Sequence, residues 1–384
     1  MNATLQIIDS VDEIIGPGIE DMFRQAEQQG LVNGIALGVF KNDERFIRLI
    51  GQDISIDSVF EIGSLTKVFT SQLIDICAQR NILSWDDPVS KYFSKEVRQR
   101  DAAESKSLNA TILEVALHTA GLPLLPENLM IRDSLRPFES YSIADLEAYL
   151  NHYRDAGAKP YERVYSNLGF MVLGYVLQNA TGRRFSDLME TELLRPLGLS
   201  QTFLALSDGN RSAPAFGHTL SGSPAPSSKS GIFASAGGLC STVTDQLLWI
   251  ETLLGMPSQK LFSLYQDAKG LPIGIPWSIH SSGSLYGQSG TTVGFSSYLG
   301  INQQRKYGFI LMMNRQNPLL IGAIRENFER AMQGLPLNPL QGDYGVVKAK
   351  RLWPIQTVKR NLYSVDFVWN QVKRAKIRAA EKNR

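Results

Sequence analysis

Two residues whose side chains can carry out acyl chemistry together lie three positions apart early in the chain. Ser64 and Lys67 follow Gly63 in the run Ser64-Leu65-Thr66-Lys67, and residues at this spacing share one face of a helix. A serine hydroxyl is a weak nucleophile at neutral pH, and a lysine activates it by accepting its proton when burial or nearby positive charge lowers the lysine pKa. The glycine allows a sharp turn that would point the Ser64 backbone N–H at an anionic oxygen. The same spacing also fits an ordinary helix start with serine as its cap.

A tyrosine and an asparagine two positions apart form a second candidate pair. Tyr165 and Asn167 follow a loop-forming stretch, and loops that enter a rigid scaffold often carry catalytic groups. A phenol beside a lysine can pass a proton between a serine, the lysine and a leaving group. The Asn167 amide can hold the lysine amine and a substrate carbonyl. A competing Tyr149-Leu150-Asn151 lies in a segment with the capping and apolar spacing of an amphipathic helix, so we expect Tyr149 to be a packed helix residue.

Further segments occur in the same order as in a known family. They are His118-Thr119-Ala120-Gly121-Leu122-Pro123, the stretch 165–199 with Pro196-Leu197-Gly198-Leu199, and Ser235-Ala236-Gly237-Gly238-Leu239-Cys240-Ser241-Thr242. Together with the two pairs above, they resemble the serine β-lactamase and penicillin-binding-protein superfamily, nearest its class C-like esterase and D-peptidase branch. The resemblance covers residues 30–330.

The resemblance implies a third motif on an inner strand, where the family usually carries Lys-Thr-Gly. The best match is Gln288-Ser289-Gly290-Thr291, which departs at its first position. In the family the residue after the glycine donates its backbone N–H to the oxyanion, and this residue maps onto Thr291. The Ser64 and Thr291 amides would then form an oxyanion hole, and the resemblance makes Asn167, Gln288, Ser289 and Gly290 substrate-binding residues. A plain bulged strand is the alternative interpretation.

Glutamine at position 288 changes the expected substrate. Lysine there would attract the carboxylate of a β-lactam or a peptide terminus, whereas Gln288 offers neutral hydrogen bonds. We therefore expect a neutral ester, thioester or amide of a small intracellular metabolite or biosynthetic intermediate, with Ser64, Lys67 and Tyr165 as the catalytic residues. Hydrolysis and acyl transfer stay open. So do a β-lactamase or D-aminopeptidase type of amide hydrolysis and a catalytically silent binding protein on the same scaffold.

The hydrophobic periodicity along the chain, together with the resemblance, predicts an α/β fold. This fold is an antiparallel sheet flanked by helices, with an inserted all-α domain. We expect the α/β domain at residues 1–82 and 231–335, the mainly helical insertion at 83–230 and a basic extension at 340–384. The helix carrying the serine should run over 64–82. Residues 220–229, rich in Ser, Pro and Gly, predict a loop at the rim of the pocket.

Composition and charge agree with a globular enzyme that acts on small molecules. The net charge of +2 over 384 residues argues against a nucleic-acid binder. The four histidines are scattered without ligand spacing, so neither a metal nor another cofactor is expected. Cys77 and Cys240 are expected to be buried free thiols.

The two ends of the chain carry further expectations. Residues 1–23 lack a basic start and an apolar core of the signal-peptide kind, and no run of about 18 apolar residues occurs, so a cytoplasmic location is expected. Residues 348–384 contain eleven Lys or Arg and two acidic residues. This basic tail could dock on an anionic membrane or an acidic partner, or it could be a solvated helix pinned to its own acidic domain.

Overall fold

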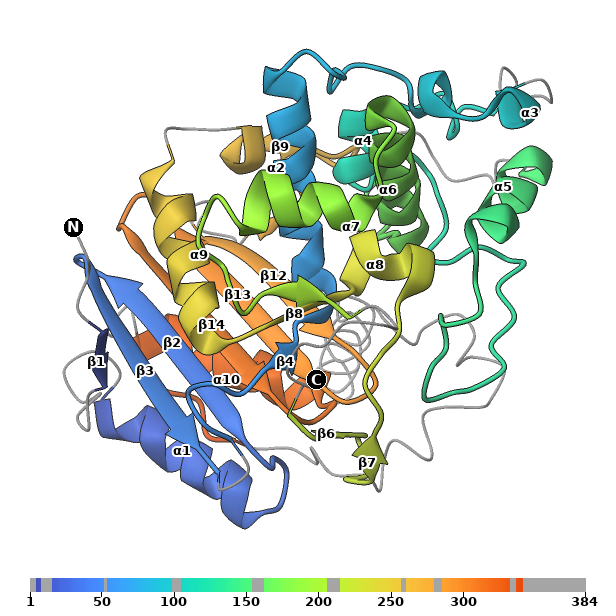
Figure 1. The fold of residues 1–384 in the computed structure, drawn as a ribbon. Helices are drawn as coiled ribbons and strands as arrows, with labels where there is room; N and C mark the ends of the chain where they lie inside the picture. The colour runs from blue at the N-terminus through green and yellow to red at the C-terminus, as the bar shows by residue number, and fades with distance from the viewer. Residues whose placement is uncertain are drawn as a thin grey trace, which may run out of the picture.

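A nine-stranded sheet forms the centre of the computed structural model (Figure 1). The structure describes residues 5–7, 16–51, 54–98, 105–153, 162–205, 215–256, 260–279, 285–331 and 336–340. The strand order is β1-β3-β2-β14-β13-β12-β11-β10-β9. The strands are β1 (Leu5–Ile7), β2 (Ile35–Lys41), β3 (Glu44–Ile50), β9 (Tyr265–Gln266), β10 (Pro272–Ile273), β11 (Ser278–Ile279), β12 (Leu285–Thr291), β13 (Ser296–Asn302) and β14 (Tyr307–Met313).

Pairing in this sheet is antiparallel except between β1 and β3. The predicted α/β fold with an antiparallel sheet between helices is therefore confirmed. The helices are α1 (Gly16–Gln28), α2 (Thr66–Gln79), α3 (Lys95–Arg98), α4 (Ile112–Ala116), α5 (Ile143–His152), α6 (Asn167–Thr181), α7 (Phe185–Leu188), α8 (Ala234–Gly237), α9 (Val243–Gly255) and α10 (Pro318–Ala331).

The two faces of the sheet are covered by different helices because side chains alternate along each strand. On β2, Ile35 and Leu37 belong to a core cluster shared with α1 and α10. Ala36 and Phe40 belong to a second cluster, which extends through α9 and α2 into α6. The larger cluster thus joins the sheet to the helices that follow it, and α2 runs through its middle.

Short elements complete the fold around α2. Figure 1 shows α3, α4, α5 and α6 gathered on one side of the molecule, next to α2. The shorter pieces are the strands β4 (Phe60–Glu61), β5 (Phe203–Leu204), β6 (Gly217–His218), β7 (Pro224–Ala225) and β8 (Leu239–Ser241), the 3-10 segments η2 (Gly63–Leu65), η3 (Val89–Tyr92), η5 (Gly231–Phe233) and η6 (Lys260–Phe262), and the π-helical segment η4 (Met189–Leu194). The domain boundaries expected at 83 and 230 stay a prediction.

Two expected elements differ from the structure. The helix expected over 64–82 begins at Thr66, because Gly63 takes φ of +51° and residues 63–65 form a tight 3-10 turn first. It ends at Gln79, since Asn81 adopts φ of +57°. The loop expected over 220–229 contains strand β7, which pairs with β6.

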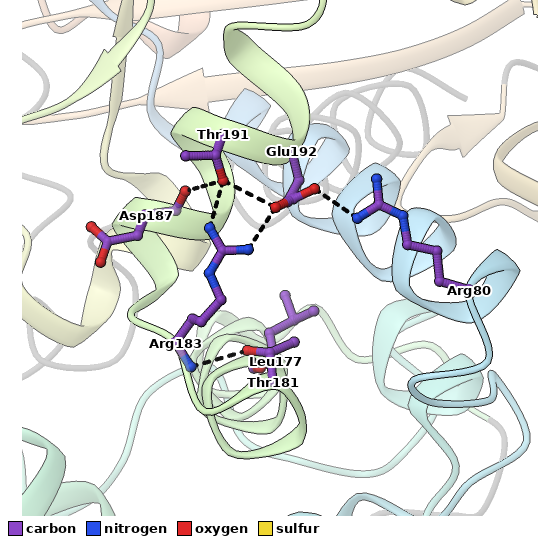
Figure 2. A network of polar contacts seen from close by, with 7 residues as sticks. All are labelled: Arg80, Leu177, Thr181, Arg183, Asp187, Thr191 and Glu192. Atoms are coloured by element: carbon purple, nitrogen blue, oxygen red, sulfur yellow. Dashed lines mark hydrogen bonds and ion pairs between the residues drawn. The ribbon is translucent and has the colours of Figure 1, made fainter.

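A polar network fastens the far end of α2 to the neighbouring helical segment, as Figure 2 shows. Glu192 of η4 accepts hydrogen bonds from Arg80, at 2.6 Å, and from Arg183, at 2.5 Å. Arg183 also donates to the Thr191 hydroxyl at 2.6 Å. The two guanidinium groups lower the pKa of Glu192 to about 2, so this carboxylate stays charged and links three segments.

The remaining structural expectations concern cysteines, metals and the tail. Cys77 and Cys240 are buried free thiols, as expected. Over the described ranges, no group of three or more His, Cys, Asp or Glu residues could hold a metal ion. None of the helices in those ranges combines the length and apolar character needed to cross a membrane. The basic extension lies outside the described residues from position 341 onward.

Candidate active site

Ser64 lies in the tight turn that leads into α2, and its position depends on two close backbone contacts. A Cβ atom on Gly63 would lie 2.7 Å from the Thr291 nitrogen, and one on Gly290 would lie 2.0 Å from the Ile62 carbonyl oxygen. Both distances are shorter than any real Cβ contact, so both positions require glycine. The turn and the end of β12 are therefore in direct contact, which brings the Thr291 amide beside the backbone of Ser64.

Lys67 is fully buried one turn further along α2. Its Nζ lies 2.7 Å from Asn167 Oδ1, 2.7 Å from the Ala236 carbonyl oxygen and 3.0 Å from Ser64 Oγ. Burial lowers the pKa of this amine well below its usual value of 10.5, because desolvation disfavours the charged form. A neutral amine has two N–H donors for the two carbonyl oxygens, and its lone pair is then left to accept the Ser64 proton.

Tyr165 completes the contact group at Ser64. Its hydroxyl donates to Ser64 Oγ over 2.8 Å. Its ring also lies beside the amine, with Lys67 Nζ 5.0 Å from the ring centroid. The Ser64 oxygen thus faces a base on one side and a phenol on the other. Ser64, Lys67, Tyr165 and Asn167, predicted from two distant segments, are joined by hydrogen bonds from Lys67 to Ser64 and Asn167 and from Tyr165 to Ser64.

His118 and its turn hold the segment that carries Tyr165. The His118 carbonyl accepts from the Val164 N–H at 2.8 Å, and its Nδ1 accepts from the Ser166 N–H at 3.1 Å. The rings of His118 and Tyr165 lie 4.6 Å apart. Burial lowers the pKa of His118 well below its ordinary value, with smaller effects from Arg163 and Lys67, so the ring is neutral. His118 therefore has a structural role: its hydrogen bonds position the backbone on both sides of Tyr165.

Asn167 begins α6, which starts for a clear local reason. Ser166 is the N-cap, since its Oγ accepts from the Gly169 N–H at 2.8 Å. Its hydroxyl also donates to the Pro123 carbonyl at 2.6 Å. The competing Tyr149 belongs instead to α5, where a Ser142–Asp145 capping box starts the helix and the Tyr149 ring packs 5.6 Å from that of Tyr153.

The β12 residues are placed unequally. Thr291 lines the cavity in front of Ser64, whereas Gln288, Ser289 and Gly290 precede it on the strand without lining that cavity. Gln288 is 4% exposed, and its side-chain amide donates to the Ser289 carbonyl at 3.1 Å. An uncharged group therefore occupies the position that the resemblance matches to a lysine.

A cavity open to solvent lies in front of Ser64. Among the described residues, none that lines it is acidic. The lining residues are Gly63, Ser64, Arg136, Pro137, Phe138, Asn167, Ser228, Lys229, Ser230, Phe233, Ala236, Gly237, Thr291, Thr292 and Val293. Ser228 and Lys229, the last two residues of the stretch 220–229 that was expected at the pocket rim, line the cavity.

A buried carboxyl group behind the cavity fixes this rim. Glu61 is 3% exposed, and it accepts from the Ser228 N–H at 2.5 Å and from the Ser228 hydroxyl at 2.8 Å. Burial raises the pKa of Glu61, although the hydrogen bonds from Ser228 and Thr292 oppose the shift. The rim segment is therefore tied to β4, three residues before the nucleophile.

Two features of the site could not be recognised from residue types in the sequence. The Ala236 carbonyl that accepts from Lys67 lies in the Ala-Gly-Gly-Leu segment, but a backbone acceptor has no residue type of its own. Arg136 lies in a segment without a recognisable motif, and its place at the cavity follows from the fold alone.

Comparison with known proteins agrees with this geometry. A family model described as Beta-lactamase matches residues 19–330. A beta-lactamase of Pseudomonas fluorescens is 24% identical over 361 residues, covering 80% of this chain and 94% of the relative. Protein flp of Staphylococcus aureus strain N315 is 26% identical over 320 residues, covering 77% of this chain and 62% of flp.

Solved structures show the same fold. A class C beta-lactamase superposes with a TM-score of 0.70 at 21% identity, covering 88% of this chain and 99% of that one. The beta-lactamase from Sulfitobacter sp. EE-36 gives 0.68 at 19% identity, covering 85% and 98%. Because the family model spans most of the sequence, this chain belongs to the beta-lactamase family of serine hydrolases.

Proposed function

We propose that this protein is a serine acyl hydrolase that forms an acyl-enzyme on Ser64. One observation carries the proposal: Ser64 Oγ lies 3.0 Å from the buried Lys67 amine and 2.8 Å from the Tyr165 hydroxyl. A nucleophile within hydrogen-bond reach of a base and an acid is the arrangement that covalent acyl transfer needs.

The proposed first step makes one bond and breaks one. Neutral Lys67 takes the Ser64 proton as Oγ attacks the substrate carbonyl, and the developing oxyanion is held by the Ser64 and Thr291 amides. Collapse of this intermediate expels the leaving group, which takes a proton from Tyr165. In net terms, the proton removed from Ser64 departs with the leaving group. A water molecule then releases the acid, or an alcohol or amine takes up the acyl group.

The proposed substrate is an ester, thioester or amide of a small molecule whose part beside β12 is uncharged. The support is that Gln288 stands at the position matched to the family's lysine and is uncharged, so β12 brings no cation to the cavity. Hydrolysis of a β-lactam is the competing activity that the names of the relatives favour, and hydrolysis of a D-amino-acid amide is a further alternative.

The test compares four substrates under one condition: 4-nitrophenyl butyrate, a butyryl thioester, D-alanine 4-nitroanilide and a chromogenic cephalosporin. We expect the ester or thioester to give the highest kcat/KM. Ser64→Ala should lower it by about 10⁴-fold or more, whereas the exposed Ser221→Ala should not change it. Turnover that survives in Ser64→Ala contradicts the mechanism, and a preference for the cephalosporin contradicts the substrate class. A folded protein that turns over none of the four would support the silent binding protein.

A further inference from the structure

Arg136 brings an uncompensated cation to the cavity that holds Ser64. It lines this cavity together with its neighbours Pro137 and Phe138. The Arg136 Nε atom is buried and has no hydrogen-bond partner, although the side chain as a whole is half-buried. In the part of the chain that the structure describes, no carboxylate forms an ion pair with Arg136. A buried N–H without an acceptor is unfavourable, and a ligand oxygen at this position would relieve it.

The other charged groups around the cavity are already compensated. Lys229, the second cationic residue of the lining, pairs with Glu139 at 3.3 Å. Lys67 is held near its neutral form by burial. The Glu61 carboxyl group is occupied by two hydrogen bonds from Ser228. Arg136 is therefore the group in the lining that an anionic ligand would complement most.

The surface beside Arg136 is apolar. Phe138 and Phe233 stack with ring centroids 3.7 Å apart and an interplanar angle of 20°, and both line the cavity. Such a pair suits methylene groups, while a guanidinium group suits a carboxylate, which it can bind through two parallel hydrogen bonds. A ligand that matches both would have a short carbon chain ending in a carboxylate.

We propose that Arg136 binds a carboxylate of the substrate, so that the enzyme acts on carboxylate-bearing esters or thioesters, such as half-esters of a dicarboxylic acid. This inference rests on the proposed function and refines its substrate class. The cation that binds the substrate would thus lie at Arg136 and not at position 288. The part of the substrate beside β12 would be uncharged, and the part beside Arg136 would be anionic. Arg136 then determines specificity, and the residues around Ser64 carry out the chemistry.

The experiment uses two matched pairs of esters, which locate the carboxylate in either half of the substrate. The first pair is mono-4-nitrophenyl glutarate and 4-nitrophenyl pentanoate, and the second is 3-acetoxybenzoate and phenyl acetate. For each pair the measured quantity is the ratio of kcat/KM, charged over neutral, after subtraction of the spontaneous rate. We expect the wild type to prefer the charged ester in at least one pair.

The matched variants are Arg136→Gln, Arg136→Lys and, as a control, Arg132→Gln. Arg132 is an exposed arginine on the same segment and does not line the cavity. Arg136→Gln should lower the ratio about tenfold, the usual loss for one charge-assisted contact. Arg136→Lys should lower it less, because the charge stays while the planar fork is lost. Arg132→Gln should leave the ratio unchanged.

The outcomes separate this inference from the proposed function. If Ser64→Ala abolishes hydrolysis of the neutral esters but both ratios are the same in the wild type and Arg136→Gln, the hydrolase stands and the role of Arg136 is wrong. If neutral-ester hydrolysis survives in Ser64→Ala, the proposed function itself fails. Variants are compared after circular dichroism shows wild-type melting temperatures, and Arg136→Lys provides the test if Arg136→Gln does not fold.

Discussion

The Lys67 amine donates a hydrogen bond to the Asn167 side-chain oxygen over 2.7 Å, although 100 residues separate the two in the sequence. The Ala236 carbonyl oxygen lies at the same distance on Nζ. Two acceptors use both protons of a neutral amine and direct its lone pair to Ser64. The helical part of the chain and the α8 segment therefore act together to orient the base, which explains how a lysine on a buried helix can serve as a proton acceptor.

Activity should depend on pH through Lys67. Burial lowers the pKa of this amine, so the base should already be neutral at pH values well below 10. The value of kcat/KM should therefore reach its plateau at pH values well below 10. As pH falls through the lowered pKa, the amine takes up a proton and activity should fall. A pH profile of kcat/KM for 4-nitrophenyl butyrate measures this. A profile that rises only near the ordinary lysine pKa of about 10.4 would contradict the account.

The free energy of unfolding should also depend on pH through Lys67, and it should increase as pH rises. Between the lowered folded pKa and the unfolded value, the unfolded chain binds one more proton, so folding becomes more favourable as pH rises. Lys67→Met should therefore be more stable than the wild type, with the difference shrinking by about 1.4 kcal/mol per pH unit between the lowered folded pKa and the unfolded value. Urea unfolding at several pH values measures the difference, and a gap that is constant with pH argues against a neutral buried lysine.

Tyr165→Phe should remove the acid while keeping the ring. The hydroxyl contacts Ser64 Oγ, and the loss of a positioned proton donor lowers kcat by about 10²–10⁴. Tyr149→Phe is the matched control, because Tyr149 belongs to the packed face of α5. Steady-state kinetics on both variants provide the measurement. Equal effects of the two substitutions would show that Tyr165 contributes packing and no chemistry.

Gly290→Ala should damage the oxyanion hole. The new methyl group would clash with the Ile62 carbonyl and push β12 away from the serine turn. Loss of one oxyanion donor lowers kcat by about 10²–10³. Gly322→Ala is the control, since nothing lies within 4 Å of its Cβ position on α10 and alanine should stabilise that helix by about 0.5–1 kcal/mol. If Gly290→Ala is fully active, the Thr291 amide does not hold the oxyanion.

Glu192→Gln should weaken the network at the end of α2. The pKa of Glu192 is lowered to about 2 from 4.5, so its contribution is present above pH 4.5 and is lost as pH falls toward 2. At pH 7 the variant should be less stable by about 1 kcal/mol, because the two arginine partners are partly exposed. Glu190→Gln, whose carboxylate lies 3.8 Å from Arg195, should change stability less. Equal stability of Glu192→Gln and wild type at pH 7 would contradict this.

The fold and the family could be predicted from the sequence because both leave local patterns of residue types along the chain. The strands of the sheet alternate between two cores, and the segments around Ser64, His118, Tyr165 and Ser235 have residue types that a reader can match. Gly63 also predicted the turn. The 3-10 conformation of residues 63–65, after which α2 begins at Thr66, depends on contact with β12 and was not predicted.

Other parts of the site could not be predicted because they depend on tertiary contacts. The Ala236 carbonyl is a backbone atom, and its use by Lys67 depends on how α8 packs against α2. Arg136 looks like any surface arginine until the chain places it beside the nucleophile. Gln288 was visible in the sequence, but its burial and its bond to the Ser289 carbonyl were not.

Covalent trapping tests the central claim most directly. The wild type, Lys67→Met and Ser64→Ala are each mixed with a fluorophosphonate, and intact mass and peptide mapping follow the adduct with time. We expect a single adduct on Ser64 in the wild type, formation at least about 10²-fold slower in Lys67→Met, and none in Ser64→Ala. An adduct at another residue, or equal labelling rates in the wild type and Lys67→Met, would contradict the assignment of Ser64 as a nucleophile activated by Lys67.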